Sequence, residues 1–217
     1  MLPSLRLVLA IGLDGRLAPP DGGAAQLGGP GDRRALEEAL AWADGALIGA
    51  NTLRLHRSTA LIHAPDLLDQ RHELGLSPQP VALVVSRSGE FSSDLGFWHQ
   101  PLQRWLLAPS GVGVVRGFDS HLPLRSWRQA LSELAVRGLR RLVLLGGAEL
   151  AGELLSEDLV EEIQLTLCPI LLGGSQHWLR IPALGHPSHW RLLDSRSLGG
   201  DEWLLHYRRA ASPNIGG

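Results

Sequence analysis

The chain has 217 residues, of which 44% are hydrophobic, and a formal net charge of −2. That length and apolar content suffice for one sizeable core, and the even composition predicts a single domain over residues 1–211 followed by a disordered tail at 212–217. All 20 basic residues are arginines scattered along the sequence, which argues against nucleic acid or an anionic membrane as a partner. Because the sequence has no lysine, it excludes Schiff-base catalysis and Walker-type phosphate binding.

Two further features point to a protein of the cytoplasm with a small-molecule ligand. The single cysteine, Cys168, lies in an apolar strand pattern, so it excludes an internal disulfide and is expected to be a buried hydrophobe. The sequence has no apolar run long enough to span a membrane, and its first apolar segment reaches Gly12 too soon for the core of a signal peptide. We therefore expect a cytoplasmic protein.

The first half of the sequence alternates strands with helices. Residues 5–11 predict a strand that closes in a turn at Asp14, and Asp32 is expected to cap a helix that runs to about Ala43, with one apolar stripe facing a sheet. A helical turn is expected over residues 50–59. Three further buried strands are predicted, at residues 46–49, 80–85 and 105–108.

The second half begins with a helix and ends with a hairpin. Ser126 and Gln129 have the spacing of a capping box, which predicts a helix over residues 127–137 that ends at Gly138. Two strands flanking Gly199 and Gly200 predict the final hairpin, at residues 190–193 and 203–207.

Between these elements lies the most informative stretch of the chain. Residues 142–145 form an uninterrupted apolar run, as expected of a parallel strand that is buried on both faces, and the run stops at two glycines, Gly146 and Gly147. A short helix and another strand follow, and Glu161 and Glu162 at the start of that strand are expected to face solvent or a partner subunit. The whole pattern predicts an α/β domain with a mostly parallel sheet and an antiparallel edge.

Small or polar residues follow several of the predicted strands. Because ligands of open parallel sheets bind outside the carboxyl ends of the strands, we expect these residues to meet at one crevice. Ser86 and Arg87 offer a hydroxyl and a guanidinium, which suit an adenosine 2′-phosphate and so favour NADPH. Gly146 and Gly147 would let a pyrophosphate approach the N-terminus of the next helix, provided that Glu149 points away. Taken alone, each pattern also fits an ordinary turn.

Five blocks of this sequence resemble the RibD C-terminal reductase family of riboflavin synthesis. They are LDGR at 13–16, ADGALIGANT at 43–52, VVSRSG at 84–89, GGAELAGELLSEDLVEEI at 146–163 and PILLGG at 169–174. The resemblance implies a dihydrofolate-reductase-like α/β fold, with a mostly parallel central sheet, helices on both faces and an antiparallel C-terminal hairpin. The sequence lacks the HxE and PCxxC zinc motifs, so we expect no deaminase domain.

The resemblance also implies an activity and a set of site residues. The enzyme would use NADPH to reduce the ribosyl group of 5-amino-6-(5-phosphoribosylamino)uracil, or of the related diaminopyrimidinone, to a ribityl chain by hydride transfer, and it would be a homodimer. Asp14 would be the catalytic residue at the substrate, and Arg54 and Arg57 would bind the substrate phosphate. Seven residues would line the cofactor site: Gly49, Thr52, Ser86, Arg87, Gly146, Gly147 and Leu150.

Other interpretations stay open because the sequence departs from the family pattern at Val8, Gly12 and Leu145. One alternative is a dihydrofolate-reductase-like oxidoreductase of a different heterocycle, which would need a carboxylate on the inner stripe of the first long helix, where the sequence shows no clear one. The other is a non-catalytic nucleotide-binding paralogue. The histidines have no ligand-like spacing beside paired carboxylates, so we expect no metal site.

Overall fold

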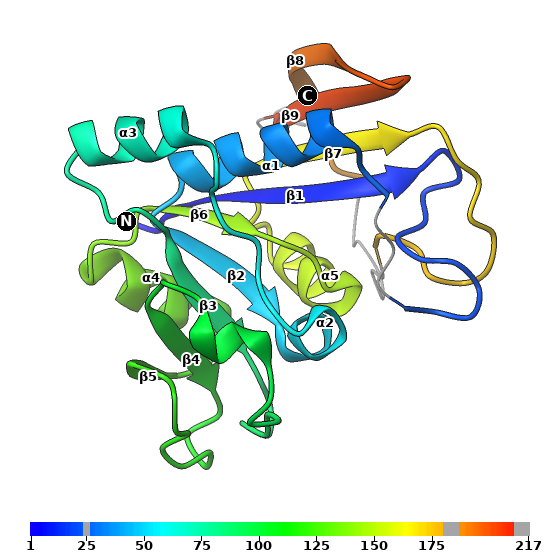
Figure 1. Ribbon diagram of the computed structural model, residues 1–217. Helices are drawn as coiled ribbons and strands as arrows, with labels where there is room; N and C mark the ends of the chain where they lie inside the picture. Colours follow the sequence, from blue (N-terminus) through cyan, green and yellow to red (C-terminus); the bar gives the residue numbers. More distant parts are fainter. Residues whose placement is uncertain (24–26, 180–186, 211–217) are drawn as a thin grey trace, which may run out of the picture.

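The computed structural model describes residues 1–23, 27–179 and 187–210, and in this part of the chain nine strands form one sheet (Figure 1). The strands are β1 (Ser4–Gly12), β2 (Gly45–Gly49), β3 (Val81–Val85), β4 (Arg104–Ala108), β5 (Ser120–Pro123), β6 (Arg141–Leu144), β7 (Glu162–Cys168), β8 (Trp190–Gly199) and β9 (Glu202–Arg209). Their order is β5-β4-β3-β2-β6-β1-β7-β9-β8. The seven strands from β5 to β7 are parallel, and β9 runs antiparallel to β7 and β8, so the predicted sheet and final hairpin are confirmed. The expected tail at 212–217 lies outside the described residues.

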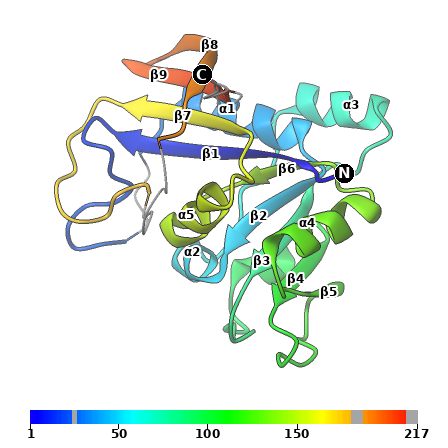
Figure 2. The same ribbon diagram turned by 180° about the vertical axis from the view of Figure 1, so that it is seen from behind.

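Helices lie on both faces of the sheet, as expected (Figures 1 and 2). They are α1 (Pro30–Trp42), α2 (Ala50–His56), α3 (Pro65–Glu73), the 3-10 helix η1 (Gly96–His99), α4 (Trp127–Val136) and α5 (Ala148–Ser156). Side chains alternate between the faces of a strand, so Leu5, Leu7 and Leu9 pack with α4 and α5, whereas Val8 packs with α1 and α3 on the opposite face. The α2 helix and η1 pack on that opposite face over β2, β3 and β4. None of the described helices is long and apolar enough to cross a membrane.

The predicted cap of α1 is wrong. The helix begins at Pro30, with Gly29 at the N-cap, and no side chain caps it. Proline suits the first helical position because its fixed φ fits the helix and its missing N–H would have no partner there. Asp32 therefore lies inside the first turn. The cap of α4 is confirmed, because the Ser126 hydroxyl accepts a hydrogen bond from the Gln129 amide at 3.3 Å.

The α3 helix was not predicted. Polar contacts, rather than an apolar stripe that a sequence pattern could reveal, fix its position. Its buried side chains are Leu67 and Arg71. The Arg71 guanidinium donates to three backbone carbonyls at the C-terminal end of α1, and the Glu37 carboxylate accepts from the His63 and Ala64 amides that precede α3, both at 2.8 Å. The β5 strand was also missed. It is a short edge strand, where proline is tolerated.

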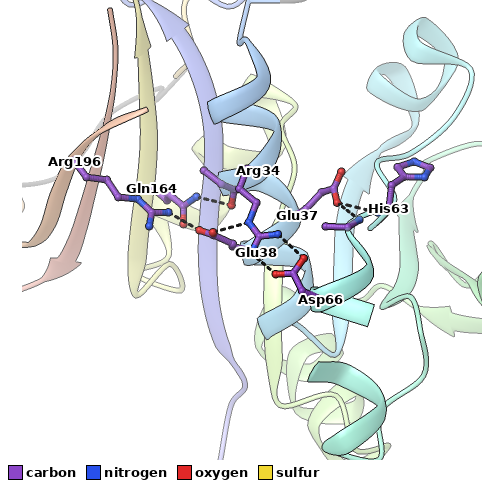
Figure 3. A network of polar contacts seen from close by, with 9 residues as sticks. Arg34, Glu37, Glu38, His63, Asp66, Gln164 and Arg196 are labelled. Carbon is purple, nitrogen blue, oxygen red and sulfur yellow. Dashed lines mark hydrogen bonds and ion pairs between the residues drawn. The ribbon is translucent and has the colours of Figure 1, made fainter. Parts of the chain in front are cut away.

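Charged side chains tie α1 to its neighbours on both sides (Figure 3). Arg34 donates to the two oxygens of Asp66 in α3 at 2.9 and 2.6 Å. Glu38 accepts from Arg34 and from Arg196 of β8, and Gln164 of β7 donates to an α1 carbonyl at 3.3 Å. These contacts fix the position of α1 over β1 and β7.

Glu162 contradicts the expectation that it faces solvent or a partner. Its side chain is 6% exposed and contacts His206 Nε2 at 2.9 Å, Arg208 at 2.6 Å and Arg6 at 2.9 Å. Hydrogen bonding with His206 and Arg208 and the charge of Arg6 outweigh burial and lower the pKa of Glu162 to about 2. Glu161 is exposed, as expected, and accepts from the Ser4 hydroxyl. Cys168 is buried, as expected, and burial raises the pKa of its thiol to about 11.

Glu162→Gln should destabilise the protein by about 2–4 kcal/mol at neutral pH, because it removes the charge that Arg6 and Arg208 share. The folded-state pKa lies below the ordinary value of 4.5, so Glu162 contributes its full stability above that value and loses it as pH falls toward 2. Denaturant unfolding at a series of pH values measures this. The difference between the two proteins should shrink steadily over that window, and a difference independent of pH would contradict the assignment.

Candidate functional site

The carboxyl ends of the parallel strands do not finish level. Leu7 of β1 pairs with Leu144, the last residue of β6, so β1 continues from Val8 to Gly12 beyond the end of β6. The β7 strand accompanies it and pairs Cys168 with Gly12. At about 3.3 Å per residue, the β1 and β7 half of the sheet projects roughly 16 Å past β6. The centre of this edge is therefore a step, with β6 and β2 on its lower side.

The two glycines lie at the foot of this step. Gly146 has φ +94° and Gly147 has φ +98°, and Gly147 is the N-cap of α5. A Cβ at Gly147 would lie 3.5 Å from Thr52 Oγ1, so the diglycine lies against α2. Figure 1 shows α2 and α5 side by side. Gly49, the N-cap of α2, ends the adjacent strand. Leu150, in the first turn of α5, is 7% exposed.

Ser86 and Arg87 follow β3, the next strand along the edge, because Gly49 pairs with Val85. Ser86 is 4% exposed, and its hydroxyl accepts from the Gly89 amide at 3.0 Å, so it closes the turn. Arg87 is exposed, and no residue in the described part of the chain forms a hydrogen bond or ion pair with its guanidinium. The structure thus brings the predicted cofactor residues to one edge and leaves Arg87 as an unpaired cation there.

Arg54 and Arg57 lie on the β3 side of α2. Arg54 donates to the Glu90 carbonyl at 2.7 Å and lies over the Phe91 ring, with 5.3 Å between the guanidinium carbon and the ring centroid. Arg57 pairs with Asp94 at 2.8 Å. Both partners belong to the loop after β3. Since β2 and β6 separate β3 from β1, these two arginines do not lie beside Asp14.

Asp14 links two of the blocks that resemble the family, LDGR at 13–16 and PILLGG at 169–174. Its Oδ2 accepts from the Leu172 and Gly173 amides at 3.0 and 2.8 Å and lies 3.2 Å from Arg16. The Gly173 hydrogen bond and the charge of Arg16 hold the pKa of Asp14 below its ordinary range. Its Oδ1 is buried without a hydrogen-bond partner among the described residues. Asp14 therefore braces the loop after β7 against the turn after β1.

Asp32 is a residue that sequence reasoning missed. The α1 helix runs opposite to β1, so its first turn lies over the projecting end of the sheet (Figure 1). The Asp32 carboxylate lies near the Thr166 hydroxyl of β7 and the Glu202 carboxylate of β9. Burial, and then the charge of Glu202, raise the pKa of Asp32. Pro30 was the signal that could have found it, since proline at the first helical position places Asp32 within the helix.

Two hollows in the described surface lie away from these residues. One, of about 320 Å³, lies between β5 and α4 and is lined by Leu122 and Arg125. The other, of about 310 Å³, is apolar and lies between α5 and the strands from β7 to β9, with Trp178 and Trp190 in its lining. The candidate site lies outside both hollows, at the edge of the sheet. Among the described residues, no three histidine, cysteine, aspartate or glutamate side chains gather as metal ligands.

The fold is dihydrofolate-reductase-like. Dihydrofolate reductase from Enterococcus faecalis superposes with a TM-score of 0.56 at 12% identity, covering 96% of this chain and 97% of that one. A pyrimidine reductase-like protein from Corynebacterium diphtheriae superposes with a TM-score of 0.80 at 20% identity, covering 96% and 92% of the two chains. The expected fold class is confirmed.

A model of the RibD C-terminal domain family matches residues 3–204, and the chain belongs to this family. One curated relative, the 2,5-diamino-6-ribosylamino-4(3H)-pyrimidinone 5′-phosphate reductase of Archaeoglobus fulgidus, is 24% identical over 80% of this chain and 84% of its own length. Riboflavin biosynthesis protein RibD of Haemophilus influenzae is 25% identical over 94% of this chain, which spans 58% of that protein. The resemblance seen in the sequence is confirmed.

Asp14→Ala should free the loop after β7, because the Leu172 and Gly173 amides lose their acceptor. Hydrogen exchange followed by mass spectrometry should then be faster in residues 170–174 than in the wild type. Asp21→Ala is the control, since Asp21 is exposed further along the loop after β1 and should leave that exchange unchanged. Equal exchange in all three proteins would remove the bracing role of Asp14.

Proposed function

We propose that this protein is an NADPH-dependent reductase of riboflavin biosynthesis. It would reduce the ribosyl group of 5-amino-6-(5-phosphoribosylamino)uracil, or of the related diaminopyrimidinone, to a ribityl chain by hydride transfer. The observation that carries this proposal is the family match over residues 3–204, together with the relatives that bear reductase names. The grouping of the diglycine, Thr52 and Arg87 at one sheet edge supports it.

The lower side of the step fits a dinucleotide. The positive φ of Gly146 and Gly147 and the absence of Cβ atoms let a ligand approach the backbone, and the first amides of α5 are free to donate to a pyrophosphate. Glu149 in the same turn is exposed. Arg87 would bind the 2′-phosphate through charge-assisted hydrogen bonds. A nicotinamide cofactor bound there supplies the hydride, and the protein positions it.

The substrate would lie along the same edge, between the β3 side and the projecting end of β1. Arg54 and Arg57 are our candidates for its phosphate, and Arg57 would exchange Asp94 for that group. The pyrimidine would then extend toward Asp14 and the β1 strand. In this arrangement Asp14 acts by holding the loop after β7 against the substrate.

We also infer a cytoplasmic homodimer. Leu192, Leu193 and Trp203 of the final hairpin are 47%, 38% and 50% exposed, and β8 is an edge strand, so this hairpin offers apolar surface and free backbone groups to a second copy. Analytical ultracentrifugation should give twice the monomer mass of 23.5 kDa. A monomer at micromolar concentration would contradict this inference and leave the proposed activity standing.

The proposed activity is tested by incubating the purified protein with NADPH and each of the two phosphoribosylaminopyrimidines. Loss of the nicotinamide absorbance, with a product two hydrogens heavier than the substrate by mass spectrometry, is the expected result. NADPH binding without turnover of either pyrimidine would contradict the activity. Absence of binding would also contradict the cofactor site.

The presence of Asp32 in α1 favours one second candidate. A dihydrofolate-reductase-like oxidoreductase of another heterocycle needs a carboxylate on its first long helix, and Asp32, with its raised pKa, supplies one. The same assay with dihydrofolate separates the two candidates. Oxidation of NADPH by dihydrofolate, with neither pyrimidine reduced, would replace the first proposal by the second.

Arg87→Ala should weaken NADPH binding by about 10- to 100-fold, because a charge-assisted hydrogen bond contributes about 1.5–3 kcal/mol. NADH lacks the 2′-phosphate, so its affinity should stay within about twofold. Fluorescence titration of both nucleotides measures this. Arg140→Ala is the control, since Arg140 is exposed at the opposite edge of the sheet. Equal weakening of NADPH and NADH would rule out the 2′-phosphate assignment.

Gly147→Ala should weaken both nucleotides by about tenfold or more, because the new methyl group fills the space between Thr52 and the approaching phosphates. It should also destabilise the protein by about 1–2 kcal/mol, since φ at +98° is strained for alanine. Gly138→Ala, at φ +92° and with open space around it, is the matched control for strain alone. It should lose similar stability and keep its nucleotide affinity.

A further inference from the structure

The loops after β1 and β7 together form an arm that projects beyond the sheet (Figures 1 and 2). The arm consists of residues 13–20 and 169–178. Its two loops are joined by backbone hydrogen bonds, one of which runs from the Leu13 amide to the Ile170 carbonyl at 2.8 Å. Leu13 and Leu171 are 61% and 73% exposed. The arm therefore holds apolar side chains in water at a fixed position beside the sheet.

The final hairpin has one face that is covered and one that is apolar. Residues that pair directly in antiparallel strands point to the same side. Gln164 contacts α1 and pairs with His206, so this side of β9 lies against α1. Leu165 packs with the core on the α5 side and pairs with Leu205, which therefore points away from α1. The apolar hollow of about 310 Å³ lies on this second face, and none of the described residues that line it is charged.

Exposed apolar side chains gather on the arm and the hairpin. Six of the eleven large hydrophobic residues that are exposed in the described chain belong to these two segments: Leu13, Ile170, Leu171, Leu192, Leu193 and Trp203. Such a concentration on a folded protein marks an interaction surface. A small molecule in the hollow would leave the arm and Trp203 in water. A macromolecular partner that covers the arm and the hollow together accounts for all of this surface.

A second copy of this chain fits both surfaces at once. In a two-fold dimer, residue i of one copy contacts residue j of the other, and residue j contacts residue i. Trp203 pairs with Leu167, which lies along the chain between Leu165 at the hollow and Ile170 on the arm. Trp203 is thus an exposed aromatic residue midway between the two surfaces. A two-fold axis near Trp203 sets the arm of each copy over the hollow of the other.

We propose that the protein forms a two-fold dimer in which the arm of each copy, through Leu171, packs into the apolar hollow of its partner. The contact is continuous with the apolar surface of the hairpin. It also reaches the candidate site, because Leu172 follows Leu171 and donates its amide to Asp14. The partner's hollow therefore fixes the loop that Asp14 braces, and each site is complete only in the dimer. This consequence for the site rests on the proposed function, whereas the docking does not.

Cross-linking between two singly substituted copies tests the docking directly. Leu171→Cys and Ser188→Cys, produced together in separate chains with different tags, place one thiol on the arm and one in the hollow. The native Cys168 is buried and should not react. A short bis-maleimide should join one copy of each chain into a covalent dimer. Leu74→Cys paired with Ser188→Cys is the control, because the exposed Leu74 follows α3 and precedes β3, at the opposite edge of the sheet.

Leu171→Asp should raise the dissociation constant of the dimer by about 30-fold or more, because it places a carboxylate in an apolar hollow. Leu74→Asp is the control for a new charge at an exposed leucine and should leave that constant unchanged. Sedimentation over a concentration series measures both. The Leu171→Asp monomer should also lose about tenfold or more in kcat/KM for the pyrimidine and keep its affinity for NADPH, because the diglycine and Arg87 lie away from the arm.

Three results would overturn the docking. They are a wild-type monomer, a wild-type dimer whose 171 and 188 positions do not cross-link, and a Leu171→Asp dimer as stable as that of the wild type. A monomer that retains an apolar small molecule in native mass spectrometry would assign the hollow to a ligand instead. The cross-link does not depend on the folding of Leu171→Asp. If the cross-link forms and neither pyrimidine is reduced, the proposed function fails and the docking stands.

Discussion

The early end of β6 at the centre of the sheet is the constraint on which the rest of the site depends. A strand that stops at Leu144 beside one that continues to Gly12 leaves a step in an otherwise continuous parallel sheet. The two glycines after β6 make that stop possible, because both take a positive φ that other residues rarely adopt. The step brings α2 and α5 together on its lower side and leaves the end of β1 projecting under α1. The proposed cofactor binds on the lower side of this step, and the proposed pyrimidine lies toward the projecting end of β1.

The charged side chains fall into two groups with different roles. Glu162 and Asp14 are paired with cations or backbone amides, and they hold strands and loops in register. Arg87 and Asp32 lie at the edge without a partner of opposite charge in the described chain. Burying the Asp32 carboxylate without a cation costs free energy, so its position is better explained by a ligand that donates hydrogen bonds.

Local patterns in the sequence predicted eight of the nine strands in the described sheet and placed the proposed cofactor residues after several of them. Apolar runs that end in glycine or a small polar residue mark the strand ends, and the rule that parallel strands finish at one edge brings those ends together. Sequence patterns did not predict contacts between residues that lie far apart in the sequence. No local pattern around Glu162 predicts its contact with His206. The α3 helix depends on backbone carbonyls at the end of α1, to which the Arg71 guanidinium donates. Asp32 was misread because a cap and a first-turn residue look alike locally.

Ligand binding along the step can be measured by mapping hydrogen exchange across the whole chain with and without NADPH. NADPH should slow exchange in three segments that are far apart in sequence: residues 49–53, 86–89 and 146–151. Exchange around the apolar hollow beside Trp178 and Trp190 should not change. Protection centred on that hollow, with the diglycine segment unaffected, would show that the nucleotide binds away from the step.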